Sequence, residues 1–173
     1  RYTWRGAQID VFDAGLVAST WSWNTQRGVD EGWLPSPGRD DGDPFHLNSV
    51  EVVDDQLYVN FRPRHMVARI DRPTGDLVWR LGIDGDFLLV DETGAPADPA
   101  NWFDGPHAPE PDGDRFLFYD NGGSPGPRKS RALEMVIDEV AMTARITWEF
   151  TEDGWFESIW GDIDRLPDGN VLI

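Results

Sequence analysis

Short runs of apolar residues alternate with turn residues along the chain, and no segment sustains the apolar period of about 3.6 residues that marks an amphipathic helix. Three tight turns each lead into such a run, and they lie at Asp54-Asp55, Asp112-Gly113 and Asp168-Gly169. The runs occupy residues 56–60, 115–119 and 170–173. A turn and its strand therefore recur about every 57 residues, which predicts a repeated β structure with little helix.

A second recurring unit is a strand, a turn and a further strand that ends on tryptophan. It reads "ARIDRPTGDLVWRLG" at 68–82 and "EMVIDEVAMTARITWEF" at 134–150, with a weaker copy, "AQIDVFDAGLVASTW", at 7–21. Gly75 and Gly15 supply a residue that tolerates a positive φ in the turn, so these units are predicted to be β-hairpins.

Many short strands, a recurring hairpin and one tryptophan per unit predict an all-β fold of the β-propeller type, in which four-stranded blades surround a central channel. The period exceeds the roughly 40–50 residues of common propeller repeats, and long Pro/Gly/Asp loops account for the excess. We expect a single partial propeller domain, about three blades of a six-bladed ring. Its repeats are predicted at 1–45, 46–106 and 107–159, with the next beginning at 160–173.

The alternative fold is a β-sandwich, which gives no reason for tryptophan to recur at the same point of each unit. The chain begins with Arg1 rather than Met and stops within an apolar run at Ile173. These ends predict that the sequence is a fragment of a longer protein.

The composition narrows the function classes. The 173 residues are 39% hydrophobic, as in a globular domain, and carry a net charge of −17, which argues against nucleic acid or an anionic membrane surface as a partner. Lys129 is the only lysine, a bias that fits either adaptation to high salt or a GC-rich genome. Without cysteine there is no disulfide, thiol nucleophile or cysteine zinc site. Neither a transmembrane segment nor a signal peptide is predicted within this stretch.

Two of the three histidines precede the first strand of a repeat, where loops of a propeller converge at the channel mouth and bind ligands. His46 and His107 are these residues, and the third copy has Trp160 at that place. The repetition predicts that both imidazoles face one common site. His65 is predicted to be a surface or capping residue instead.

A cluster of cations follows the strand after His107, in "DNGGSPGPRKSRALE". Arg128, Lys129 and Arg131 lie there on a Gly/Pro-rich loop that can bring backbone amides close to an anion. The alternative is that these cations are solvent-exposed and only balance the charge of nearby acidic residues. Arg62 and Arg64 form a similar pair after the strand that follows His46.

Metal and cofactor sites are not predicted. The acidic turns at 40–43 and 112–114 lack the further spaced ligands of a calcium loop, and no carboxylate is placed by spacing to complete a transition-metal site with the two histidines. The chain has no G-x-S-x-G elbow, Walker loop or dinucleotide fingerprint, which argues against serine-hydrolase, NTPase and NAD-dependent functions.

Five segments in order carry a resemblance to a known family: "FHLNSVEVVDD", "RHMVARIDRPTGDLVWRLG", "WFDGPHAPEPDGDRFLFYDNG", "SRALEMVID" and "FESIWGDIDRLPDGNVLI". Each motif is weak alone, but their succession resembles the arylsulfotransferase family of six-bladed propellers. The resemblance implies an exported enzyme, without a cofactor, that transfers a sulfuryl group from an aryl sulfate donor to a phenolic acceptor through a sulfohistidine.

The resemblance also implies roles for individual residues. His46 and His107 match two auxiliary catalytic histidines, and Arg128 is the first candidate for the sulfate-binding arginine, with Arg131 the second. Asn121, in the characteristic Asp-Asn-Gly turn, and Trp160 are expected to bind substrate.

The nucleophilic histidine is expected beyond Ile173, so a chain that ends there would be inactive alone. The segment after His107, Ala108-Pro109-Glu110-Pro111, departs from the family pattern and is expected to hold His107 differently.

Two other functions remain open. A noncatalytic propeller could bind a protein or glycan partner through its mouth, with the histidines as loop corners. A quinone-dependent dehydrogenase shares the hairpins, but its metal site is not recognisable here.

Overall fold

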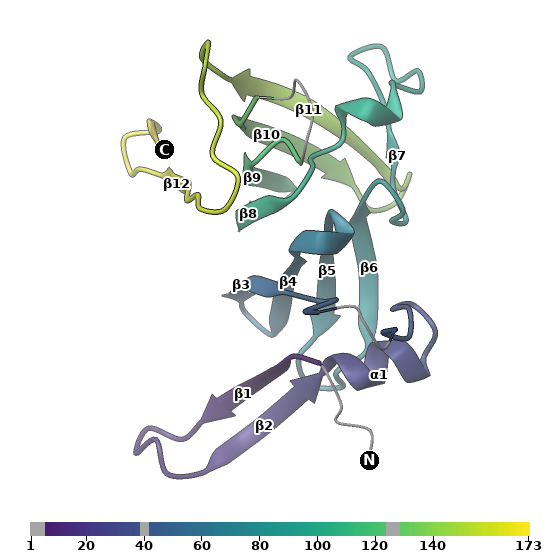
Figure 1. The fold of residues 1–173 in the computed structure, drawn as a ribbon, viewed down its shortest axis with the longest axis vertical. Coiled ribbons are helices and arrows are strands. Elements are labelled where there is room, and N and C mark those ends of the chain that lie inside the picture. The colour runs from purple at the N-terminus through teal and green to yellow at the C-terminus, as the bar shows by residue number, and fades with distance from the viewer. Residues whose placement is uncertain (1–5, 39–41, 124–128) are drawn as a thin grey trace. The chain divides into compact units, whose positions relative to one another are not determined.

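The computed structural model describes residues 6–38, 42–123 and 129–173 (Figure 1). Antiparallel sheets dominate these residues, so the predicted all-β class is confirmed. No sheet of the described residues closes on itself, and the propeller stays a prediction. The chain divides into two compact units, Arg1–His46 and Leu47–Ile173, which are described separately.

The first unit contains a hairpin followed by a short helix. Strands β1 (Gln8–Phe12) and β2 (Ser19–Asn24) pair antiparallel, which confirms the hairpin predicted at 7–21. The predicted positive φ at Gly15 is wrong, because Leu16 adopts it instead, at 54°. Helix α1 (Thr25–Asp30) begins where the Asn24 side chain accepts a hydrogen bond from the Gln26 amide.

The second unit begins with a sheet of four antiparallel strands in sequence order. They are β3 (Leu47–Val53), β4 (Gln56–Phe61), β5 (Met66–Asp71) and β6 (Leu77–Gly82), and the short helix η1 (Arg62–Arg64) links β4 to β5. Gly75 has a φ of 74° in the β5–β6 turn, so the hairpin predicted at 68–82 is confirmed with its turn residue. The predicted repeat thus begins as a single meander, as a propeller blade does.

A second sheet repeats this meander. Strands β8 (Pro106–Asp112), β9 (Arg115–Asp120), β10 (Arg131–Asp138) and β11 (Thr143–Phe150) pair antiparallel in order. Strand β7 (Leu88–Leu89) adds to β11 in parallel, and the short helix η2 (Pro99–Asn101) lies between β7 and β8. A separate pair, β12 (Asp164–Arg165) and β13 (Val171–Leu172), ends the chain.

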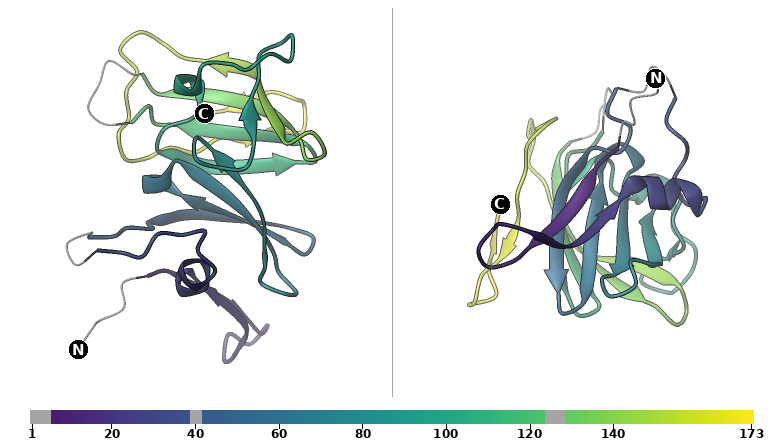
Figure 2. Two further views of the ribbon diagram at one scale, coloured as in Figure 1. Left: turned by 90° about the vertical axis from the view of Figure 1, so that its right-hand side faces the viewer. Right: turned by 90° about the horizontal axis from the view of Figure 1, so that it is seen from below.

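The two large sheets of the second unit lie next to each other (Figures 1 and 2). Buried residues of both sheets form one core that is rich in aromatic side chains. The ring of Phe116 lies 5.6 Å from Tyr58 and 5.9 Å from Trp79, which also contacts Phe87 edge to face at 5.4 Å. Trp79, one of the recurring tryptophans, is therefore buried between the two sheets. Its counterpart Trp148 lies on β11 and is partly exposed.

Among the described residues, no helix is long and apolar enough to cross a membrane.

Candidate functional site

Strand register defines which residues of the two sheets correspond. The pairs that flank the first turn of each sheet are Val53↔Gln56 and Asp112↔Arg115. Asp54 and Gly113 are the residues with a positive φ in these two turns. Asp54 therefore corresponds to Gly113, and not to Asp112 as the sequence prediction had it. Counted back along the strand, His107 corresponds to Asn48 rather than to His46.

His46 is the last residue of the first unit, and Asp43 holds it in a turn. The His46 amide donates to Asp43 Oδ1 at 3.0 Å, and its ring Nδ1 lies 2.9 Å from Asp43 Oδ2. A φ of 33° at His46 makes this turn unusual for a residue with a side chain. The predicted equivalence of His46 and His107 is therefore corrected, because His46 lies before β3 whereas His107 lies within β8 and matches Asn48 in the strand register. The catalytic role of His46 stays a prediction.

His107 lies at the start of β8, and its ring contacts the end of β9. Its Nδ1 is 2.5 Å from Oδ1 of Asn121, the residue that follows β9. The Asn121 amide nitrogen donates to the carbonyl oxygens of Glu157 and Trp160, at 2.7 Å and 2.8 Å. Asn121 thereby links His107 to the segment 157–160, and only 1% of its surface is exposed.

Two further amides hold the backbone directly before His107. Asn60 Nδ2 donates to the carbonyl oxygen of Pro106 at 2.6 Å and to Asn48 Oδ1 at 2.6 Å. Asn48 Nδ2 donates to the same Pro106 oxygen at 3.0 Å. The first sheet thus fixes the strand of the second sheet that carries His107. Sequence reasoning missed Asn60, which is fully buried and sits inside an apparently apolar strand.

Arg62 contributes a cation to the same region. It corresponds to Asn121 in the strand register, and its Nη2 donates to the Ser158 carbonyl oxygen at 2.5 Å. Arg62 Nε is buried without a hydrogen-bond partner among the described residues. Gly105 lies beside it with a φ of 66°, and a Cβ added there would be 3.9 Å from Nε. Arg62 and Asn121 therefore hold one segment, 157–160, from two neighbouring sheets.

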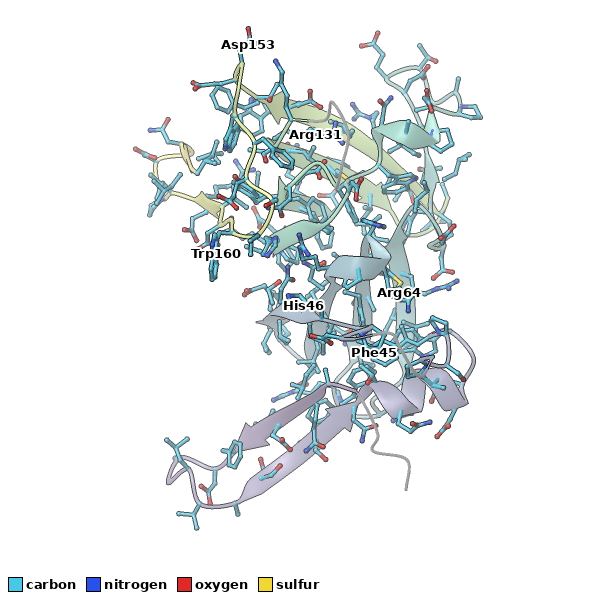
Figure 3. The ribbon with its side chains drawn as sticks, viewed as in Figure 1. Phe45, His46, Arg64, Arg131, Asp153 and Trp160 are labelled. Atoms are coloured by element: carbon cyan, nitrogen blue, oxygen red, sulfur yellow. The ribbon has the colours of Figure 1, made fainter. Side chains whose placement is uncertain are left out.

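The segment 157–160 is also held from within. The Glu157 carboxylate accepts hydrogen bonds from the amides of Ile159, at 2.9 Å, and Trp160, at 3.3 Å, and these bonds lower its pKa from the ordinary value of 4.5. Buried Ser130 accepts from the Glu157 amide at 2.7 Å. The Trp160 backbone is fixed while its side chain, labelled in Figure 3, is 73% exposed.

Arg131, which is labelled in Figure 3, forms ion pairs in this structure. Its Nε donates to Asp120 Oδ2 at 2.7 Å and its Nη1 to Glu149 at 2.6 Å. Nη2 donates to the carbonyl oxygens of Asn101, at 2.8 Å, and Trp102, at 3.1 Å. Burial raises the pKa of the Asp120 carboxyl, and the Arg131 guanidinium acts against that rise. Arg131 as a sulfate ligand stays a prediction that requires some of these bonds to open.

The other two cations of the predicted cluster are Lys129 and Arg128. Lys129 forms an ion pair with Asp153 and lines, with Arg131 and Thr151, a surface cavity of about 300 Å³. Arg128, the first candidate for sulfate binding, lies outside the described residues.

His65 braces the loop that leads to His107. It has a φ of 48° at the end of η1, and its Nδ1 lies 2.9 Å from the Gly105 amide nitrogen and 2.7 Å from Asp104 Oδ1. The amide contact requires a lone pair on Nδ1, whereas the carboxylate contact requires a proton there. His65 is the C-cap residue of η1, and its ring contacts the loop through either the Gly105 amide or the Asp104 carboxylate at a time.

No group of three or more His, Cys, Asp or Glu side chains in the part of the chain that the structure describes could hold a metal ion. The available chemistry is that of an imidazole, a guanidinium and buried amides.

These features define an all-β protein in which the ends of neighbouring antiparallel sheets bring a histidine, an arginine and buried amides to one polar site. The family model for arylsulfotransferase (ASST) matches residues 6–173, and the chain belongs to this family. The resemblance inferred from the five sequence motifs is thereby confirmed. No curated protein matches the chain.

Proposed function

We propose that the protein transfers a sulfuryl group from an aryl sulfate donor to a phenolic acceptor, with His107 as a catalytic residue. Membership of the arylsulfotransferase family supports the reaction class. The observation that carries the site is the buried Asn121 amide, which holds the His107 ring beside the segment 157–160.

The chemistry needs a nucleophile, a base and fixed positive charge. In the first half reaction, the sulfur–oxygen bond of the aryl sulfate breaks, its electron pair leaves with the phenolate, and a sulfur–nitrogen bond forms at a histidine. In the second, the acceptor phenol loses its proton, and its oxygen attacks the sulfur and releases the histidine. The sulfohistidine is proposed to form on a residue C-terminal to Ile173.

His107 is proposed to accept the proton of the acceptor phenol. Imidazole is suited to this step because its ordinary pKa lies near neutral pH. In the proposal, His46 remains the second auxiliary histidine. Neither role needs a cofactor.

Positive charge would stabilise the sulfuryl oxygens. By analogy with phosphoryl transfer, charge spreads over these oxygens in the transition state, and catalysis depends mainly on positioning and electrostatics. Arg62 joins Arg128 as a proposed sulfate ligand, because its guanidinium lies beside Gly105 and the segment 157–160, which Asn121 also holds. The exposed ring of Trp160 is proposed to contact the aryl group.

Acceptor-dependent turnover tests this function. Full-length protein is incubated with p-nitrophenyl sulfate, with and without phenol, and nitrophenol is followed by absorbance and phenyl sulfate by mass spectrometry. We expect phenol to accelerate nitrophenol release and phenyl sulfate to form in equal amount. Folded protein that releases no nitrophenol would instead favour a noncatalytic binding module, and release of inorganic sulfate without phenyl sulfate would indicate a hydrolase.

A further inference from the structure

We infer that Asn121 is a positioning residue that fixes His107 as the Nδ1–H tautomer, so that Nε2 carries the basic lone pair. The tautomer follows from the hydrogen bonds of Asn121 alone. Its importance for turnover rests on the proposed function. The inference gives Asn121 a different role from the substrate-binding role expected from the sequence.

The orientation of the Asn121 amide carries the first step. An amide nitrogen donates two hydrogen bonds and an amide oxygen only accepts. The end of Asn121 that faces the segment 157–160 meets two carbonyl oxygens, those of Glu157 at 2.7 Å and Trp160 at 2.8 Å. A flipped amide would place its oxygen against both carbonyls and lose both bonds. The hydrogen-bond network therefore assigns the nitrogen to that end.

The position of the proton on His107 follows from this orientation. With its nitrogen engaged by the segment 157–160, Asn121 presents Oδ1 to Nδ1 of His107, 2.5 Å away. Oδ1 has no hydrogen to give, so a hydrogen bond forms only if Nδ1 carries the proton. In the neutral ring, the lone pair then lies on Nε2.

The surroundings prevent the amide from turning. Asn121 is 1% exposed. Ser130 is fully buried and contacts the backbone of both Asn121 and Glu157. Ser130 Oγ accepts from the Glu157 amide at 2.7 Å and lies 3.1 Å from the carbonyl oxygen of Asn121. Because both ends of the link are fixed, Asn121 holds the tautomer and the angle of the imidazole ring together.

The chemical class of this link matters for a base. A neutral amide oxygen orients the ring and stabilises the imidazolium only modestly, whereas a carboxylate in the same place would favour the charged ring more strongly. Proton transfer from the acceptor phenol would occur at Nε2. Burial of Asn121 argues that it acts through His107 and not on the substrate.

Nuclear magnetic resonance of the histidine rings tests the tautomer directly. Full-length protein labelled with ¹⁵N-histidine is examined by long-range ¹H–¹⁵N correlation, at a pH where the rings are neutral, and the signal lost in His107→Gln is assigned to His107. We expect Nδ1 to be protonated and Nε2 to be bare. A protonated Nε2 with a bare Nδ1 would overturn the inference, whether or not the protein transfers sulfuryl groups.

Substitutions separate positioning from general stability. Asn121→Ala should lose the Nδ1–H preference and lower kcat by about 10²-fold or more, as loss of a correctly poised base does, with a much smaller change in KM. Asn121→Asp keeps the acceptor oxygen and should retain the tautomer even if its loss of two donors lowers stability. An unchanged tautomer in folded Asn121→Ala would show that Asn121 is merely structural.

Discussion

Asn60 donates its side-chain amide to the carbonyl oxygen of Pro106, 46 residues further along the chain, at 2.6 Å. The bond joins β4 to the first residue of β8 and so places His107 relative to the first sheet. The site is thus built across two sheets of the second unit, by amides that are buried and by loops that they hold.

Replacing Asn60 should therefore destabilise the protein, and the loss should depend on the hydrogen bonds that the new side chain can form. Asn60→Ala loses two donated bonds and is expected to cost about 1–3 kcal/mol in the free energy of unfolding. Asn60→Asp should cost more, because an ionised carboxylate would face Asn48 Oδ1 and the Pro106 oxygen with no hydrogen to offer. Urea denaturation at pH 7 measures both. An Asp variant as stable as wild type would exclude this arrangement.

The Asp120–Arg131 pair is expected to be a stabilising element. Arg131→Ala should lower the free energy of unfolding by about 3–5 kcal/mol, because it leaves a buried carboxylate unpaired. Burial already raises the pKa of Asp120, and removal of Arg131 should raise it further. A raised acid pKa destabilises the folded state fully above the folded pKa, and this penalty disappears as the pH falls to the unfolded value. The loss should therefore shrink as the pH falls from 7 toward 4.

Lys129→Ala is the matched control for Arg131, since it removes a neighbouring cation that pairs with Asp153 at the surface. Stability should be nearly unchanged in this variant at both pH values. If Arg131→Ala behaved like the control in urea but raised KM for the aryl sulfate, Arg131 would be a sulfate ligand and not a structural residue.

Glu157 should stabilise the segment 157–160 only while it is ionised. The amides of Ile159 and Trp160 lower its pKa below the ordinary value of 4.5. A depressed acid pKa gives stability that is present above the unfolded value and is lost as the pH falls through the folded value. Glu157→Gln should therefore be less stable than wild type at pH 6–7, and the difference should vanish in acid. Unfolding midpoints measured across this pH range check the prediction, which fails if the difference is constant.

Arg62 is expected to act on the donor. Arg62→Ala should reduce sulfuryl transfer by about 10²–10³-fold, as loss of one donor to a developing negative charge does. Arg72→Ala, which removes an arginine paired with Asp55 beside the opposite strand turn, should leave the rate unchanged. Steady-state kinetics with p-nitrophenyl sulfate compare the two variants. Equal rates in both would remove Arg62 from the site.

Local patterns in the sequence predicted much of the fold. The hairpins at 68–82 and 134–150 and the strands that follow the tight turns all form, because alternation and turn residues act over a few positions. Trp79 fills the space between sheets as a recurring core residue should. These features need no knowledge of distant segments.

The site could be predicted only in part, because its contacts join distant residues. His107 was identified by its place before a strand, but Asn60 and Arg62 act on partners 46 and 96 positions away. The correspondence of His46 with His107 failed because the strand pairing sets the offset between the two sheets at 59 residues, as in Val53 and Asp112, which matches His107 with Asn48. Asn121 was found through its turn motif, yet its partners lie in the segment 157–160.

The most direct test of the proposed function is the transfer rate of full-length His107→Ala. Transfer from p-nitrophenyl sulfate to phenol is measured as phenyl sulfate formed per minute, with thermal unfolding used to show that the variant is folded. We predict transfer by the wild-type protein and a rate lower by about 10²–10⁴-fold in the variant, as expected for loss of a general base. A folded His107→Ala protein that transfers as fast as wild type would contradict the assignment of this site.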